Sequence, residues 1–101
     1  MSFFKKHDRA GELPIPGPAT SDPKALEIAR VWAANRAQVV SLRVGIWKDP
    51  ANWGVMLADL ARHVVRSYVQ EDPTLDAVAL LARIKEGFEA EMAKPTDPKI
   101  S

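Results

Sequence analysis

The sequence predicts an α+β fold with three helices and one principal β-strand, and three observations lead to this prediction. Apolar residues recur at helical spacing in three segments. In a fourth segment, residues 38–47, they alternate with polar or small residues as in a strand. An Asp-Pro pair precedes each helical segment. Aspartate is a preferred N-cap, and proline is favoured at the first helical position because it has no N–H to leave unpaired.

Length and composition indicate one small soluble domain. The chain has 101 residues, of which 47% are apolar and 27% charged, and this balance excludes a wholly disordered or collagen-like protein. It has no cysteine, which excludes disulfides, thiolate metal sites and cysteine nucleophiles. No apolar run approaches the roughly 18 residues that span a bilayer, and no apolar stretch follows Lys5 and Lys6 as in a signal peptide. We therefore expect a cytoplasmic protein that does not enter a membrane.

Residues 1–21 are expected to form an extended arm or tail. Pro14, Pro16 and Pro18 stand at alternate positions, and each fixes its own φ and biases the preceding residue toward extended geometry. The arm is expected to lie over the domain, and a ligand for a proline-recognising partner is the alternative. The domain is expected over residues 22–94, with a loose tail over residues 95–101.

The first helix is expected to begin at Pro23, and its end allows two interpretations. In one, the helix runs to about Asn35, because two consecutive alanines near that end are strong helix formers. In the other, it stops near Arg30, a short strand begins at residues 31–33, and the chain turns around residues 35–36 to form a hairpin. We favour the longer helix.

Residues 38–47 form the one clear strand. A lone strand is unstable because its backbone N–H and C=O groups need partners. The partner is expected to be residues 31–34, the N-terminal arm, or the same strand of a second subunit, in which case the contact is isologous and the protein a homodimer. One face of the strand is apolar, with Val40, Leu42, Val44 and Ile46; the other is mixed, with Val39, Ser41, Arg43 and Gly45.

The second helix is expected from Pro50 to about Gln70, and the third from near Pro73 to about Ala93, before Pro95. Apolar residues of the second helix fill an arc of about 180°, which is wider than one neighbour covers. We therefore expect this helix to be central, or one side of it to be an oligomer interface. The arc contains Trp53, Leu57, Ala58, Leu60, Ala61, Val64, Val65, Tyr68 and Val69.

The segment around the strand and the second helix resembles a known family. The resemblance rests on Val40-Ser41-Leu42-Arg43-Val44-Gly45, Trp47, Asp49-Pro50, Trp53-Gly54, Leu57-Ala58-Asp59-Leu60-Ala61-Arg62-His63-Val64 and Tyr68. These residues resemble short alphaproteobacterial proteins catalogued as a domain of unknown function, over roughly residues 22–70. The resemblance implies a small bacterial cytosolic protein and supplies no activity, partner or site residue.

Candidate binding residues lie on the strand and on the second helix. Arg43 and Trp47 share the strand face opposite the apolar one, and arginine and tryptophan dominate binding hot spots. The second helix adds Asp59, Arg62, His63 and Arg66.

Asp59 and His63 are four residues apart, so they form half of a general-base pair. No serine, threonine or cysteine stands at a spacing that completes a nucleophilic set, and Asp59 can also pair with the arginines of its own helix. A solvated face of ion pairs is therefore favoured over catalysis. We predict no metal site, because one imidazole and one carboxylate are an incomplete zinc site, and no cofactor, because the glycines form no phosphate-binding loop.

The favoured function is a small, non-enzymatic, homo-oligomeric module that binds itself and another protein. One alternative is a DNA-binding dimer of the ribbon-helix-helix type, since the order strand, helix, helix matches that fold. A single strand arginine, Arg43, and a net charge of +1 disfavour nucleic acid. The other alternative is a small-molecule-binding protein or enzyme with a pocket near the strand-helix corner, at Arg43, Trp47 and His63.

Overall fold

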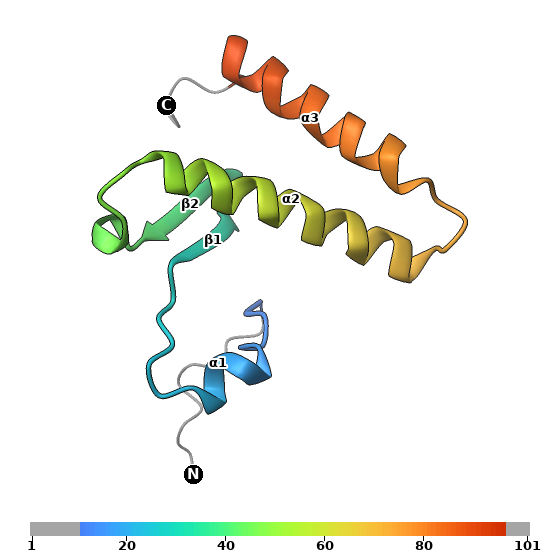
Figure 1. The fold of residues 1–101 in the computed structure, drawn as a ribbon. Helices are drawn as coiled ribbons and strands as arrows, with labels where there is room; N and C mark the ends of the chain where they lie inside the picture. Colours follow the sequence, from blue (N-terminus) through green and yellow to red (C-terminus); the bar gives the residue numbers. More distant parts are fainter. Residues whose placement is uncertain (1–10, 97–101) are drawn as a thin grey trace.

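A computed structural model describes residues 11–96 of the chain (Figure 1). The expectations for residues 1–10 and 97–101 lie outside the described part. The elements in order are a short helix α1 (Gly17–Ser21), strands β1 (Ala29–Ala34) and β2 (Ala37–Leu42), a 3₁₀ turn η2 (Val44–Ile46), and helices α2 (Ala51–Glu71) and α3 (Ala77–Ala93). The predicted α+β class with three helices is confirmed, with a short second strand completing the sheet. The first helix is not the predicted one.

The largest difference from the prediction lies in residues 23–35, which were expected as a helix. They form a turn, an extended loop and strand β1, which pairs antiparallel with β2 from Ala29 opposite Leu42 to Ala34 opposite Ala37. The favoured long helix is therefore wrong, and the alternative with a hairpin turn at residues 35–36 is right. The backbone N–H and C=O groups of β2 need hydrogen-bond partners. The segment one tight turn away supplies them at the lowest entropic cost of loop closure. Helix propensity, worth a few tenths of a kcal/mol per residue, is overridden.

The hairpin turn has two residues in the left-handed region. Asn35 has φ 53° and Arg36 has φ 62°. Two-residue turns of this kind match the right-handed twist of the flanking strands, and they favour asparagine followed by glycine. Asn35 suits its position, whereas the Cβ of Arg36 makes the left-handed conformation sterically unfavourable there.

Strand β2 ends earlier than the predicted strand over residues 38–47. Arg43 N–H donates to the carbonyl of Ile28 at 2.8 Å, which closes the last rung of the ladder. The chain then turns through η2 (Val44–Ile46). The alternation expected for residues 44–47 is therefore wrong, because this segment leaves the sheet to reach α2.

Residues 1–21 were expected to be extended throughout, and the described part contains one helical turn. Pro16 has polyproline-like angles, φ −59° and ψ 143°, as expected. Helix α1 follows at Gly17, with Pro18 at its second position, where a proline does not interrupt helical hydrogen bonds. The Thr20 hydroxyl donates to the Gly17 carbonyl at 2.7 Å.

The sequence has four Asp-Pro pairs, and the three within residues 11–96, at residues 22, 49 and 72, form the same turn. In each, an aspartate Oδ1 accepts from the N–H two residues later: Lys24 at 2.9 Å, Ala51 at 3.0 Å and Thr74 at 3.1 Å. The aspartate carbonyl accepts from the N–H three residues later: Ala25 at 3.0 Å, Asn52 at 3.0 Å and Leu75 at 3.1 Å. Asp-Pro thus specifies a capped turn, and the residues after it decide whether a helix follows.

A helix follows directly at one of the three pairs. The turn at Asp49 runs into α2, whose predicted range is confirmed to within a residue. Helix α3 begins at Ala77, four residues after Pro73, because Asp76 provides a new N-cap and accepts from Val78 N–H at 3.0 Å. The turn at Asp22 leads into the extended loop before β1.

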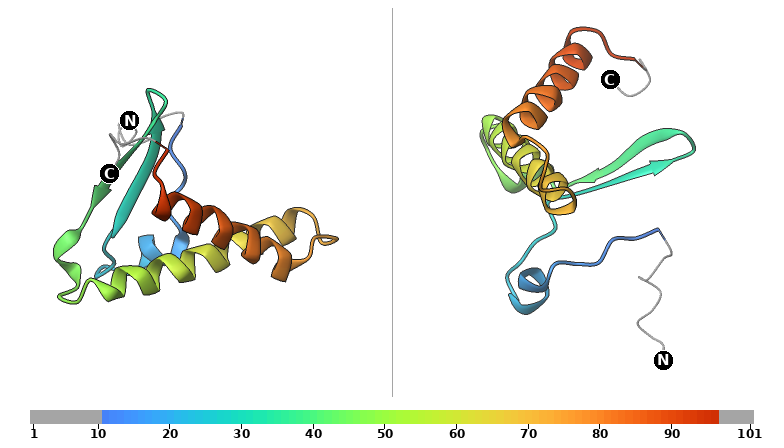
Figure 2. Two further views of the ribbon diagram at one scale, coloured as in Figure 1. Left: turned by 90° about the horizontal axis from the view of Figure 1, so that it is seen from above. Right: turned by 90° about the vertical axis from the view of Figure 1, so that its right-hand side faces the viewer.

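The hairpin extends away from the helix pair, as both views of Figure 2 show. Helices α2 and α3 pack on each other, whereas no Cα atom of either strand lies within 8 Å of a Cα atom of these helices. Val65, 7% exposed, is the one buried apolar residue of the described part.

Replacing Arg36 by glycine is expected to stabilise the fold. The left-handed conformation costs a residue with a Cβ roughly 1 kcal/mol, and part of this gain is offset by the greater freedom of glycine in the unfolded chain. We expect Arg36→Gly to raise the free energy of unfolding by about 0.5 kcal/mol in urea denaturation at fixed protein concentration. Ala33→Gly, at a regular strand position, is the control and should lower it. A loss of stability in Arg36→Gly would contradict the left-handed turn.

The turn before α3 is expected to weaken in acid. The Thr74 hydroxyl donates to Asp72 Oδ1 at 2.6 Å, and with the Thr74 N–H it lowers the pKa of Asp72 from its ordinary value of 3.8. A lowered native pKa stabilises the fold above the ordinary value, and this contribution is lost as the pH falls through the lowered pKa.

Thr74→Val should therefore bring the pKa of Asp72 closer to 3.8 in an NMR titration. Thr20→Val is the control, because the Thr20 hydroxyl donates to a backbone carbonyl. An unchanged pKa of Asp72 in Thr74→Val would show that the hydroxyl does not contribute.

Candidate functional site

Arg43 and Trp47 lie where the hairpin leads into α2. Arg43 Nε donates to the backbone carbonyl of Glu27 at 2.9 Å. Trp47 packs edge-on against Trp53 of α2, with ring centroids 5.3 Å apart and an angle of 86° between the rings. Such a pair contributes about 0.5–1.5 kcal/mol beyond the area it buries. Within one chain, Arg43 thus connects the end of the sheet to the loop before β1, and Trp47 connects the end of the hairpin to α2.

The other four candidate residues lie on α2, and all four are exposed. Arg66 Nη2 lies 2.9 Å from His63 Nδ1, so the imidazole contacts a guanidinium rather than Asp59. The Ser67 hydroxyl, the nearest along the helix, donates to the backbone carbonyl of His63 at 3.0 Å. The four side chains are thus solvated, but Asp59 forms no ion pair with Arg62 or Arg66, so the expected pairs on this face are not present.

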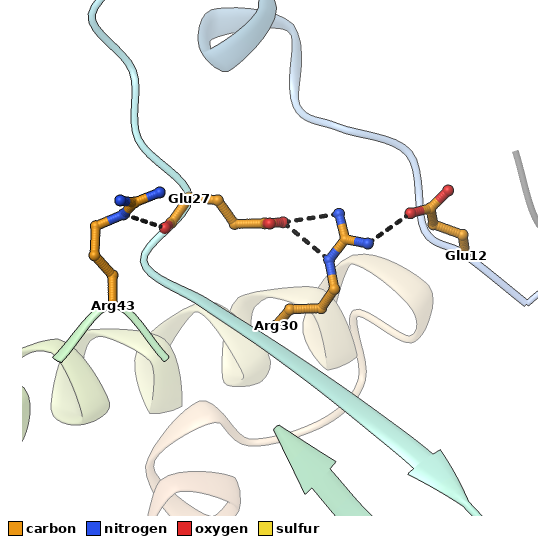
Figure 3. A network of polar contacts seen from close by, with 4 residues as sticks. All are labelled: Glu12, Glu27, Arg30 and Arg43. Atoms are coloured by element: carbon orange, nitrogen blue, oxygen red, sulfur yellow. Dashed lines mark hydrogen bonds and ion pairs between the residues drawn. The ribbon is translucent and has the colours of Figure 1, made fainter. Parts of the chain in front are cut away.

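A polar network that the sequence analysis missed ties the segment before α1 to the hairpin (Figure 3). Arg30 of β1 stands at its centre and donates from Nη1 to Glu12 Oε2 at 2.9 Å. Its Nε and Nη2 donate to Glu27 Oε2 at 3.2 Å and 3.1 Å. The Glu27 backbone carbonyl accepts from Arg43, so the network reaches the residue after β2 as well.

The network has a clear electrostatic cause and a weak sequence signal. The hydrogen bond and the charge of Glu27, and then the charge of Glu12, raise the pKa of Arg30. Glu27 and Arg30 are three residues apart, which also fits neighbours on the helix that was predicted here. The contact with Glu12 spans 18 residues and forms only because the chain reverses through α1 and the following loop, so that β1 comes to lie beside residues 11–16.

Two hollows accompany these elements. One, of about 840 Å³, lies between residues 11–16 and β1, beside the network. The other, of about 430 Å³, lies between α2 and α3. The second is lined mainly by apolar side chains, together with Arg62, Lys85 and Glu89.

One face of the hairpin is apolar and uncovered. The register places Val31 opposite Val40 and Ala29 opposite Leu42 on the same face. Val31 is 61% exposed, Val40 47% and Leu42 51%. We call these three side chains the hairpin apolar face.

A second uncovered apolar surface runs along α2. Leu60, Val64 and Tyr68 recur at every fourth residue and remain between 38% and 53% exposed. Helix α3 packs on α2, and Ala61 and Val65, on the neighbouring side of α2, are less exposed. We call Leu60, Val64 and Tyr68 the α2 apolar stripe. It belongs to the wide arc that the sequence predicts.

The described residues contain no group of three or more side chains placed to hold a metal ion. None of the helices in residues 11–96 combines the length and the apolar character needed to cross a membrane.

A family model described as a domain of unknown function, DUF5076, matches residues 12–96. The chain belongs to this family. The match is wider than the resemblance seen in the sequence and includes the segment before α1, the hairpin and both long helices. A search of curated proteins gives no match.

A solved structure from the photosynthetic bacterium Rhodopseudomonas palustrus CGA009 is similar to this DUF5076 chain. It is described as "a putative pyruvate dehydrogenase". The two chains are 34% identical with a TM-score of 0.63, and the similarity covers 85% of this chain and 87% of that chain. The two chains are therefore nearly equal in length.

Arg30→Gln is expected to release the loop that the network holds. Removing the guanidinium leaves Glu12 and Glu27 without their shared cation, so the segment before β1 should open more often. We expect several-fold faster chymotrypsin cleavage after Leu26, followed by mass spectrometry. The matched control is Arg83→Gln, because Arg83 pairs with Glu86 on the exposed face of α3. Equal cleavage in both variants would contradict a holding role for the network.

Proposed function

We propose that this DUF5076 chain is a small, non-enzymatic module that assembles with copies of itself and binds another protein in the assembled form. One observation supports the self-assembly above all. In residues 11–96 one apolar side chain is buried, whereas seventeen large apolar side chains are more than a third exposed. So small a core does not offset the conformational entropy lost when these segments become ordered. A second copy supplies the missing apolar contacts.

The uncovered surfaces suit a copy of the same chain. The hairpin apolar face and the α2 apolar stripe contain no charged side chain, and the net charge is +1, so two copies repel each other little. Both surfaces are present on every copy, which permits a closed, isologous contact.

The ribbon-helix-helix alternative has less support. That fold builds its ribbon from one strand of each subunit, whereas here both strands of the hairpin come from one chain. Arg43, the expected base-reading residue, donates to the Glu27 backbone.

The pocket alternative has less support as well. Asp59 and His63 are exposed, and neither lines a hollow. The charged groups that do line the two hollows include no nucleophile with an adjacent base. We therefore do not extend the activity in the neighbour's name to this chain.

Light scattering on a sizing column tests the proposal. We expect a mass that is a whole multiple of 11.1 kDa at micromolar concentration. Leu60→Asp, which places a charge in the α2 apolar stripe, should shift the protein toward monomer, because burying an unpaired carboxylate costs several kcal/mol. Val55→Asp is the matched control, because Val55 is 66% exposed on the opposite side of the same helix. A measured mass of 11.1 kDa for the unsubstituted protein would refute self-assembly.

A further inference from the structure

We propose that the free edge of β2 pairs with β2 of a second copy, antiparallel around a two-fold axis at Val40, to form a continuous four-stranded sheet. The inference rests on the proposed self-assembly and specifies the backbone surface through which two copies join.

The ladder within the hairpin determines which backbone groups point outward. In an antiparallel pair, every second residue exchanges both of its backbone hydrogen bonds with its opposite. Arg43 N–H donates to the Ile28 carbonyl at 2.8 Å, which identifies the odd-numbered residues of β2 as those bonded to β1. The N–H and C=O groups of Gln38, Val40 and Leu42 therefore point away from β1, at the edge of β2 where no other strand of residues 11–96 lies; we call this the free edge.

The free edge of β2 lacks the features that normally protect an edge strand. Proteins guard such edges with charged side chains, prolines or bulges. Strand β2 reads Ala37-Gln38-Val39-Val40-Ser41-Leu42, with no charge and no proline, and its register with β1 is continuous, without a bulge. Strand β1 carries Arg30, bound by Glu12 and Glu27. The β2 edge is therefore the better site for another strand.

A further strand also meets an energetic need of the hairpin. A two-stranded hairpin alone is marginally stable in water, and three or more strands with an apolar face, or packing on a helix, are needed. Neither strand here approaches α2 or α3 closely. Two hairpins joined edge to edge meet this need with no element from outside the chain.

One register uses all the free backbone groups. With Val40 opposite the partner subunit's Val40, Gln38 lies opposite the partner subunit's Leu42 and Leu42 opposite the partner subunit's Gln38. All three outward-facing residues then exchange hydrogen bonds, and a shift by two residues leaves one of them unpaired.

The same register joins the two hairpin apolar faces. Residues directly opposite in an antiparallel sheet share a face, and Val31 already lies opposite Val40. A row of four valines then crosses the sheet: Val31, Val40, and the partner subunit's Val40 and Val31. Cross-strand pairs of β-branched residues are favourable, so the side chains support the register that the backbone prefers.

Cysteine cross-linking tests this geometry directly, because the chain has no cysteine of its own. In Val40→Cys the two Cα atoms across the axis would be about 5.5 Å apart, which is within the range of a disulfide. Under mild oxidation we expect most of the protein to run at twice its mass on a non-reducing gel, and to return to one mass on reduction. Val31→Cys is the matched control. It lies opposite Val40 on the same face and is more exposed, 61% against 47%, and we expect at least tenfold less of its linked dimer.

A second variant covers the case in which Val40→Cys does not fold, as judged by circular dichroism. Gln38→Cys with Leu42→Cys places each cysteine opposite the other one of the second copy, and it should give a doubly linked dimer. Linkage by either variant, absent from Val31→Cys, supports the edge pairing. If the unsubstituted protein is oligomeric but neither cysteine variant forms a linked dimer, the edge pairing is overturned and self-assembly stands. Equal linkage in Val40→Cys and Val31→Cys leads to the same conclusion. A monomeric unchanged chain overturns both.

Discussion

The structure depends on the need of one strand for backbone partners. Residues 37–42 include two adjacent β-branched valines and form an extended segment whose N–H and C=O groups must be paired. The segment that precedes them supplies one ladder through a two-residue turn, and this decides the conformation of residues 25–36. Because the ladder uses only one edge of β2, the same requirement leaves the other edge open. The hairpin and the expectation of self-assembly thus have a common physical origin.

The remaining contacts are consistent with a chain that is one subunit of an oligomer. Arg30 gathers Glu12 and Glu27 and so determines how the chain approaches the hairpin. Trp47 and Trp53 determine how it leaves toward α2. These contacts orient the elements at their junctions and bury little apolar area, so they give the subunit a defined shape without giving it a core. Packing on α3 leaves the α2 apolar stripe exposed, and in the proposed assembly this stripe supplies the contact that completes the core.

Local signals predict the long helices well and the hairpin poorly. Asp49 and Pro50 start α2 where expected, because the apolar residues after them continue the helical period over many turns. Residues 23–35 carry an equally good capped turn and good helix formers, yet their conformation is determined by β2, which lies beyond them in the chain. The start of α3 was missed because Asp76 competes with Asp72 as a cap. The contact between Glu12 and Arg30 spans 18 residues, and no local pattern reports it. Of the six candidate residues, the structure brings His63 and Arg66 into contact, whereas Arg43 contacts Glu27 and Trp47 contacts Trp53.

The two-residue turn between β1 and β2 also has a consequence for the order of events during folding. Contacts across so short a loop form within microseconds, and helices α2 and α3 also rest on local contacts, so the elements of one chain arise quickly and independently. In the proposed assembly, apolar burial on the scale of a domain then waits for a bimolecular encounter, whose rate depends on how many copies are present. The first chains made during synthesis would carry an unguarded strand edge until they meet another. The proposal thus makes the expression level of the gene part of the folding mechanism of the protein.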